Sequence, residues 1–333
     1  MKNFVKILSV LLLAALTLSS CSYEKHSASA EAMDTFMKFE YYGSEEVGEK
    51  LVSDVKKLDS LFSTTDEKSE ISSLNCDKSI QASPETLALL ANSLELCKKL
   101  GGSLDVTILP VVEKWGFLNQ KYRVPSSGEI AEALKKVDYH NVSVSGKTVR
   151  LKNNAKLDLG AVAKGYAADR GVELLRKNKV SSAVLNYGGT VAAYGAKPDS
   201  TDWKIGIADP DSPSDFVGFV SCRDKIVATS GGYERYFEKN GKRYIHILDP
   251  KTGCPADNEV TSVSIISDSG VLCDALSTAL FVSGVQGAKE YHKASPDFGF
   301  VILTKDKKAY ISADLEGSFT LKSEDYELKI LGN

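Results

Sequence analysis

Apolar side chains recur at every third or fourth position in two stretches of the first third of the chain. Residues 47–62 show this spacing, which predicts an amphipathic helix. The second stretch has clearer ends, because Ser83 suits an N-cap, Pro84 suits the first helical position, and Gly101-Gly102 marks the end. We therefore expect two helices here, each with one face toward a core.

A third helix and a hairpin follow. Ser126 and Glu129 have the spacing of a capping box, which predicts a helix from Ser126 to about Val137. Residues 142–151 are rich in strand-forming side chains and are divided by Ser145-Gly146, a pattern typical of a β-hairpin.

The second half of the chain changes character, because short β-rich runs alternate with two helical stretches. The helical stretches cover residues 161–177 and 271–282, and the runs lie at residues 184–185, 203–207, 226–229, 244–248, 260–266 and 301–303. This mixed order predicts an α+β fold with mixed α/β layers. Neither an internal repeat nor an obvious linker interrupts it, so we expect a single compact, two-lobed domain.

The first twenty residues have a different pattern. Lys2 and Lys6 precede an apolar run over residues 7–18, which is too short to span a bilayer and is typical of an export signal. The run ends in Leu18-Ser19-Ser20-Cys21, which resembles a bacterial lipobox; the alternative is an ordinary secretory peptide with a chance cysteine.

The lipobox resemblance implies a division of the chain and a location. Residues 1–20 would be a lipoprotein signal peptide, Cys21 would carry the lipid, residues 21–32 would form a tether, and residues 33–330 would form the folded domain. Two or more acyl chains would hold the protein on the outer face of the bacterial cell membrane.

Composition removes several function classes. The chain has 41 Lys and Arg against 44 Asp and Glu, a formal net charge of −3, so it lacks the basic footprint of a nucleic-acid-binding domain. No CxxC, HExxH, Walker or GxGxxG pattern occurs, so zinc-finger, thioredoxin-like and common nucleotide-binding sites are unsupported.

Asp274 and Thr278 are candidate metal ligands. They stand four residues apart, so in a helix both side-chain oxygens lie on one face. A hard cation such as Mg²⁺ prefers such oxygen ligands. The alternative is an Asp that stabilises a helix N-terminus and a Thr that bonds back to a carbonyl.

Four further segments have polar or glycine-rich patterns. Residues 157–169 pass from a strand-like stretch into a small-residue helix, whose N-terminus with Lys164 suits an anion, although small residues also favour close helix packing. Gly188-Gly189 and residues 230–237 each follow a strand, the latter with an aromatic and a basic group. In residues 246–253, alternation places His246 and Leu248 on one strand face before a turn; a lone His is also a common structural residue.

In their order along the chain these segments resemble the ApbE family, the bacterial FAD:protein FMN transferases. The resemblance extends from about Met33 to Gly284, and its most specific parts are the HxxDPxTG and DALST signatures. The matching segments are Ala32-Met33-Asp34-Thr35, Ser69-Glu70-Ile71, Leu74-Asn75, Leu104-Asp105-Val106-Thr107, residues 158–169, Gly188-Gly189, Ser230-Gly231, residues 246–253 and residues 274–278. The resemblance implies a T-fold-related architecture.

The resemblance also implies a reaction and a set of site residues. Family members bind FAD with Mg²⁺ and attach FMN through a phosphoester bond to a Ser or Thr of a partner protein, with release of AMP. Others are FAD pyrophosphatases that give FMN and AMP, and this is the alternative function; a non-enzymatic flavin-binding lipoprotein is a third. The metal would be held by Asp274, Thr278 and the Ala161 carbonyl with Ser277 adjacent. FAD would contact Met33, Ser103, Leu104, Asp105, Asp158, Lys164 and Leu248.

The same resemblance suggests the base that accepts the hydroxyl proton. His246 is the first choice because its intrinsic pKa suits the task, and Asp249 or a metal-bound water is the alternative. The family acceptor consensus, Asp-x-x-Ser/Thr-Gly/Ser-Ala-Thr, is absent from the chain, so the acceptor is expected on another protein.

The chain departs from the family pattern at three places. Met33-Asp34-Thr35 stands where Met-Gly-Thr is usual, and Leu104 replaces a frequent Phe. Thr65 stands where many members have a Tyr, so a flavin-stacking aromatic would have to come from Tyr41, Tyr42 or Tyr187.

Overall fold

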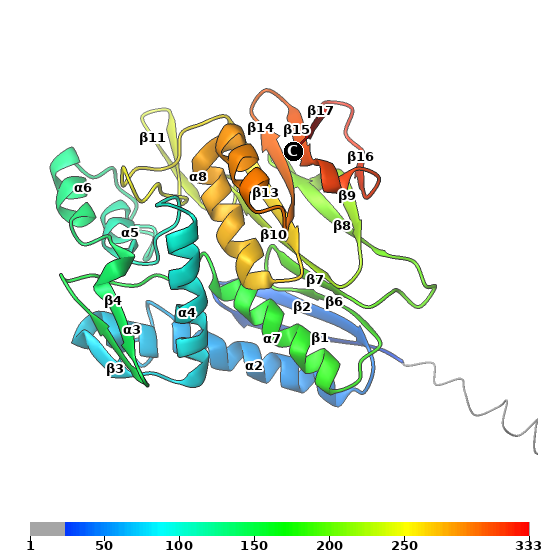
Figure 1. The fold of residues 1–333 in the computed structure, drawn as a ribbon, viewed down its shortest axis with the longest axis horizontal. Helices are drawn as coiled ribbons and strands as arrows, with labels where there is room; N and C mark the ends of the chain where they lie inside the picture. The colour runs from blue at the N-terminus through cyan, green and yellow to red at the C-terminus, as the bar shows by residue number, and fades with distance from the viewer. Residues whose placement is uncertain (1–23, 333) are drawn as a thin grey trace, which may run out of the picture.

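The centre of the molecule is a nine-stranded sheet, shown in Figure 1 in a computed structural model that describes residues 24–332. Its strand order is β1-β2-β6-β7-β10-β13-β14-β15-β17, and every pair is antiparallel except β15 and β17. The strands are β1 (Lys25–Ala32), β2 (Thr35–Tyr42), β6 (Ser182–Asn186), β7 (Thr190–Tyr194), β10 (Lys225–Gly231), β13 (Val260–Ser267), β14 (Gly299–Thr304), β15 (Lys308–Ser312) and β17 (Glu327–Leu331). The predicted mixed α/β architecture is confirmed.

The two faces of this sheet bury different side chains. On β14, Phe300 and Ile302 join the main core, whereas Val301 and Leu303 join a second cluster on the opposite face. Successive side chains of a strand point to opposite faces, so a strand covered on both sides needs apolar residues throughout. A small sheet supplies the second cover, in the order β16 (Phe319–Leu321), β9 (Ser212–Cys222) and β8 (Trp203–Asp209).

Three helices cover the main-core face: α2 (Glu46–Phe62), α7 (Ala163–Lys177) and α8 (Gly270–Ala294). The backbones of α7 and α8 touch, since a Cβ on Gly165 would clash with the carbonyl oxygen of Gly270. Asp169 fastens the same crossing, because its carboxylate accepts from the backbone N–H of Gly270 at 2.6 Å and of Val271 at 3.0 Å. Small residues in α7 therefore serve close helix packing.

Helix α8 is longer than the predicted 271–282 segment because two helical parts continue across a kink at Gly284, where φ is 72°. The helix is long and apolar enough to cross a membrane, but 61% of its most apolar window is buried inside the fold. It packs against β10, β13 and α7, so its hydrophobicity is accounted for by its place in the core.

A second lobe lies beside the sheet and contains most of the remaining elements. These are α3 (Glu70–Asp77), α4 (Pro84–Lys99), α5 (Leu109–Trp115), α6 (Ser127–Leu134), the short helix η1 (Tyr139–Asn141), and the sheet β3 (Ser79–Gln81), β5 (Thr148–Leu151), β4 (Val142–Ser145). Ser83 caps α4, and the Ser126–Glu129 capping box of α6 is present as predicted. The hairpin β11 (Tyr236–Lys239) and β12 (Lys242–Ile245) stands apart, and η2 (Ala313–Leu315) follows β15.

Two sequence predictions are wrong. Residues 25–32 are not a tether but the edge strand β1, which pairs with β2 along its whole length. Its alternating small residues hide the pattern, because only Ala30 and Ala32 are buried and the other face is polar. The strand predicted at residues 244–248 ends at Ile245, after which only an isolated bridge joins Leu248 to Pro255. The signal peptide and Cys21 lie outside the described residues.

Candidate functional site

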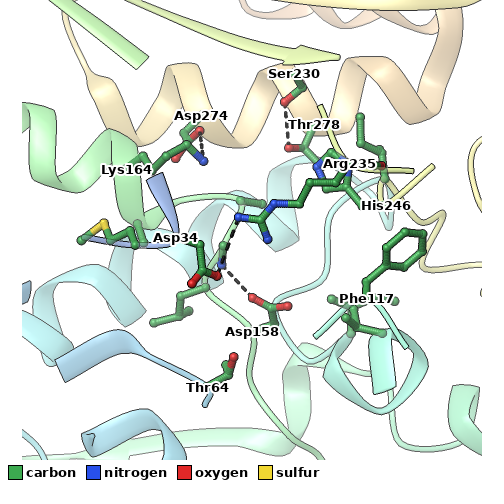
Figure 2. A pocket seen from close by; sticks show the side chains of 18 of the residues that line it. Asp34, Thr64, Phe117, Asp158, Lys164, Ser230, Arg235, His246, Asp274 and Thr278 are labelled. Atoms are coloured by element: carbon green, nitrogen blue, oxygen red, sulfur yellow. Dashed lines mark hydrogen bonds and ion pairs between the residues drawn. The ribbon is translucent and has the colours of Figure 1, made fainter. Parts of the chain in front are cut away.

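A pocket of about 610 Å³ opens between the central sheet and the second lobe, and Figure 2 shows it from close by. Its walls come from the β1–β2 turn, the end of α2, the segment before α5, the start of α7, the end of β10, the segment after β12, and α8. Eleven of the predicted site residues line it: Met33, Ser103, Leu104, Asp105, Asp158, Ala161, Lys164, His246, Leu248, Asp274 and Thr278.

Helix α8 presents Asp274 and Thr278 to the pocket from one face, as their spacing predicts. Asp274 is only 4% exposed; its Oδ2 accepts from Gly165 N at 2.9 Å and its Oδ1 lies 3.9 Å from Lys164 Nζ. Thr278 Oγ1 lies 3.3 Å from Ser230 Oγ. These hard oxygens are of the type that divalent cations prefer.

Ser277 does not line the pocket. It is fully buried, donates to the carbonyl of Asp274 at 2.9 Å, and lies 2.8 Å from Ser230 Oγ. Its contribution to the site is therefore to hold Ser230 beside Thr278. Among the described residues no three His, Cys, Asp or Glu side chains cluster in a metal-binding geometry, so a cation here would need hydroxyl, carbonyl or ligand oxygens as well.

The opposite wall contains Asp158 and the start of α7. The Asp158 carboxylate accepts from Gly160 N at 2.8 Å, and its burial in the wall raises its pKa. The tight turn brings Lys164 and Ala161 to the pocket while Gly165 packs against α8. The close helix packing expected of this segment is therefore confirmed at Gly165, and Lys164 lines the pocket, where the expected anion contact stays a prediction.

The β1–β2 turn forms the outer edge of the pocket. Met33 and Asp34 both have left-handed backbone angles, with φ of 52° and 57°, as a two-residue hairpin turn requires. Asp59 of α2 holds this turn by accepting from Met33 N at 3.0 Å. Asp34 Oδ2 lies 3.7 Å from the Arg235 guanidinium, so the carboxylate that replaces the usual glycine faces a cation across the opening.

Asp105 lines the pocket, but protein groups occupy both of its oxygens. Oδ1 accepts from the backbone N–H and the hydroxyl of Thr107 at 2.8 and 2.6 Å, and Oδ2 accepts from Tyr139 N at 3.0 Å. Burial raises its pKa. Its geometry indicates that Asp105 shapes the Ser103–Asp105 segment.

His246 follows β12 directly and points to the pocket (Figure 2). Its Nδ1 lies 3.1 Å from the carbonyl oxygen of Arg235, which can only accept, so Nδ1 carries the proton and Nε2 keeps a free lone pair. Removal of water from around the ring lowers its pKa to about 4; the hydrogen bond to the Arg235 carbonyl opposes this shift, and the positive charges of Arg235 and Lys164 add to it. The imidazole is therefore neutral at pH 7.

Asp249 does not line the pocket. Its carboxylate accepts from Lys251 N at 2.8 Å and from the Thr252 hydroxyl at 3.2 Å, and its carbonyl accepts from Gly253 N at 2.8 Å. The turn predicted for residues 249–253 is confirmed, and the side chain serves that turn. Leu248 is buried and lines the pocket beside it.

Several residues that line the pocket are not predicted from the sequence. Glu234 and Arg235 enter from the connection between β10 and β11; the pocket walls displace water from the Glu234 carboxylate and raise its pKa to about 7. The only feature of the sequence that points to Glu234 and Arg235 is the run of aromatic and charged residues after β10. No sequence pattern distinguishes Asp59, since it occupies an ordinary polar position of α2.

The proposed substitutes for a flavin-stacking aromatic are wrong. Tyr41 and Tyr187 are at most 1% exposed, and Tyr187 packs against Phe39 with ring centroids 5.1 Å apart. Tyr42 does not line the pocket. The aromatic rings that do so are Phe62 and Phe117.

Taken together, the fold and the pocket define a mixed α/β protein with a cavity that combines a carboxylate, a hydroxyl, a lysine and a neutral imidazole. Asp274, Thr278, Lys164 and His246 supply these groups. The ApbE family matches residues 33–302, so this chain belongs to the ApbE family.

The relatives and solved structures agree with this membership. The FAD:protein FMN transferase of Treponema pallidum is 35% identical over 245 residues, 68% of this chain and 68% of that protein. The protein of the same description from Klebsiella pneumoniae is 29% identical over 313 residues, 91% of this chain and 96% of that protein. The crystal structure of the ApbE protein of Thermotoga maritima has a TM-score of 0.79 and 32% identity, with 90% of this chain and 97% of that chain covered.

Proposed function

We propose that this protein is a Mg²⁺-dependent FAD:protein FMN transferase that attaches FMN through a phosphoester bond to a Ser or Thr of an acceptor protein and releases AMP. The observation that supports this most directly is that Asp274 and Thr278 of α8, Lys164 of α7 and His246 after β12 line one pocket. Its volume of about 610 Å³ suits a nucleotide-sized ligand.

The residues present fit a magnesium ion. The Asp274 carboxylate is buried, accepts from the backbone N–H of Gly165, and its nearest cation, Lys164 Nζ, is 3.9 Å away, beyond hydrogen-bond distance. A buried charge of this kind needs a partner. Asp274, Thr278 and the Ala161 carbonyl would hold the ion with phosphate oxygens of FAD, and the ion would neutralise charge on the pyrophosphate.

Side chains of this protein would bind the pyrophosphate and accept the proton of the acceptor hydroxyl. Lys164 binds the pyrophosphate from the α7 side. The acceptor hydroxyl attacks the phosphorus of the FMN half, and its proton passes to Nε2 of His246, which the Arg235 carbonyl holds in the correct tautomer. The bond from this phosphorus to the bridging oxygen breaks, and AMP leaves with that oxygen.

Bound FAD would also raise the pKa of His246. The low pKa of about 4 has Arg235 and Lys164 among its causes, and an anionic pyrophosphate between these groups opposes their effect. The imidazole then becomes a stronger base when substrate is in place.

We also propose that Cys21 is lipidated and holds the enzyme at the outer face of the bacterial membrane. Since β1 begins at Lys25, only three residues separate this cysteine from the sheet. The pocket lies at the other end of β1, where Met33 begins the turn, and eight strand residues span roughly 25 Å. The pocket would therefore lie up to about 25 Å from the anchored end of the sheet.

The test is to incubate the protein with FAD, Mg²⁺ and a peptide that carries the acceptor consensus, and to measure AMP and the peptide mass. We expect an FMN-sized mass gain on a Ser or Thr with one AMP per transfer. Release of FMN and AMP at a useful rate without any gain would instead show an FAD pyrophosphatase. Retention of uncleaved FAD would show a flavin-binding protein.

A further inference from the structure

The β11–β12 hairpin stands at the mouth of the pocket. Arg235 precedes β11 and His246 follows β12, and both line the pocket, so the hairpin rises directly from the site. Asn240 and Gly241 form its two-residue turn, with φ of 54° and 73°. A polypeptide that brings a hydroxyl to His246 would come close to the base of this hairpin.

The hairpin has one fixed face and two free edges. Phe237 and Tyr244 lie opposite each other and stack at 5.1 Å with an interplanar angle of 14°, and Phe237 stacks on Tyr122 in the same way at 5.3 Å. Tyr244 also packs against Trp115 of α5 at 5.5 Å. Neither strand pairs with any third strand in the part of the chain that the structure describes, so each keeps an unpaired backbone edge.

The charge of the hairpin is opposite to that of the chain. Residues 235–243 contain four basic side chains and one acidic side chain, a net charge of +3, whereas the whole chain has −3. Lys239 and Lys242 face each other across the hairpin and are exposed. Three of the four cations have ion-pair partners: Lys242 with Asp257 at 3.6 Å, Arg243 with Glu238 at 3.2 Å and Arg235 with Asp34 at 3.7 Å. Much of the positive charge is therefore offset, and among the described residues of the hairpin Lys239 is the cation without such a partner.

An exposed aromatic residue extends this basic surface. Tyr236 is 40% exposed, and the Arg243 guanidinium lies 4.1 Å from its ring centroid. The hairpin thus offers backbone hydrogen-bonding groups, positive charge and an aromatic ring together. This combination suits an extended peptide segment with acidic side chains.

We propose that the β11–β12 hairpin is the docking site for the acceptor protein, and that it binds an extended acidic segment beside the residue to be modified. The inference rests on the proposed transferase function and adds the chemistry of the partner. A segment aligned along the free edge would carry its Ser or Thr toward His246, at the base of the hairpin.

The experiment uses two acceptor peptides with the same consensus core, one flanked by Glu residues and one by Lys residues. FMN transfer to each is measured with the wild-type protein and with Lys239→Glu/Lys242→Glu. A matched control, Lys204→Glu/Lys225→Glu, makes the same charge change at exposed lysines on β8 and at the start of β10, outside the pocket lining. Thermal unfolding and FAD affinity are measured for all three proteins.

We expect the wild-type protein and the control to prefer the acidic peptide by about tenfold in kcat/KM, mainly through KM. The hairpin variant should lose or invert that preference with FAD affinity unchanged. Equal transfer to both peptides by the wild type would overturn the docking proposal, as would a hairpin variant that weakens FAD binding alone. Transfer to neither peptide would instead contradict the proposed function.

Discussion

Replacement of Asp274 tests the proposed metal centre, but the obvious substitution also disturbs the fold. In Asp274→Ala the backbone N–H of Gly165 loses its acceptor at the buried α7–α8 crossing. An unsatisfied buried donor costs about 1–3 kcal/mol. A loss of activity in this variant alone would therefore mix two effects.

Asp274→Asn separates them. The amide oxygen of Asn accepts from Gly165 N as the carboxylate does at 2.9 Å, so the hydrogen bond and the side-chain volume remain. Only the negative charge is lost. We expect the free energy of unfolding to stay within about 1 kcal/mol of wild type, because a neutral acceptor replaces a charged one.

Mg²⁺-dependent turnover should nevertheless fall by more than about 100-fold, since even outer-sphere partners of metal ligands contribute about 10–100-fold. The assay is AMP release from FAD over a Mg²⁺ titration, with urea unfolding of wild type, Asp274→Asn and Asp274→Ala in parallel. A wild-type Mg²⁺ response in Asp274→Asn would refute the assignment of this carboxylate as a ligand.

Three further substitutions test other parts of the site. His246→Ala should lower kcat by about 10²–10⁴ with little change in FAD affinity, and equal losses of both would make His246 a binding residue. The folded protein lowers the pKa of His246 to about 4, so it binds a proton at this ring less readily than the unfolded chain does. The free energy of unfolding should therefore decline as the pH falls from about 6.5 toward 4. Unfolding measured as a function of pH should show a shallower decline in His246→Ala. Gly165→Ala should lower the free energy of unfolding by about 1–3 kcal/mol, because the added methyl group clashes with Gly270. In the control Gly128→Ala, in α6, the methyl group meets open space, so this change should be neutral or stabilising. Similar melting temperatures for the two variants would show that the α7–α8 crossing tolerates a side chain. Asp34→Gly removes an exposed carboxylate from the pocket edge and a non-glycine left-handed residue, so FAD affinity should rise several-fold in a fluorescence titration; weaker binding would show that the Asp34–Arg235 pair orders the site.

Local sequence patterns predicted the elements whose ends depend only on residues a few positions apart along the chain. The capping residues Ser83 and Ser126 define where α4 and α6 begin, because an N-cap needs only its own side chain and an N–H three residues on. The spacing of Asp274 and Thr278 likewise predicted one shared helix face, and the structure confirms that both reach the pocket.

Other features depended on contacts between distant segments. The edge strand β1 has few large apolar residues, so its character is evident only from its pairing with β2. Asp249 and Asp105 resemble site residues in the sequence, yet neighbouring backbone groups occupy their oxygens. Tyr187 is a candidate for flavin stacking from its place in the sequence, but in the structure it is buried against Phe39.

The amino-acid sequence was therefore sufficient to predict the family, the helix caps and turns, and the polar and charged side chains that are candidates for the site. Which of these residues share a cavity follows from the packing of the folded chain, because it depends on α7 crossing α8 at Gly165 and on the turn at Met33 reaching Asp59. Burial and charge then altered the chemistry of the assembled groups: His246 and Glu234 have pKa values of about 4 and about 7 because the pocket walls replace their water. No local pattern contains that information, since it depends on residues far apart along the chain.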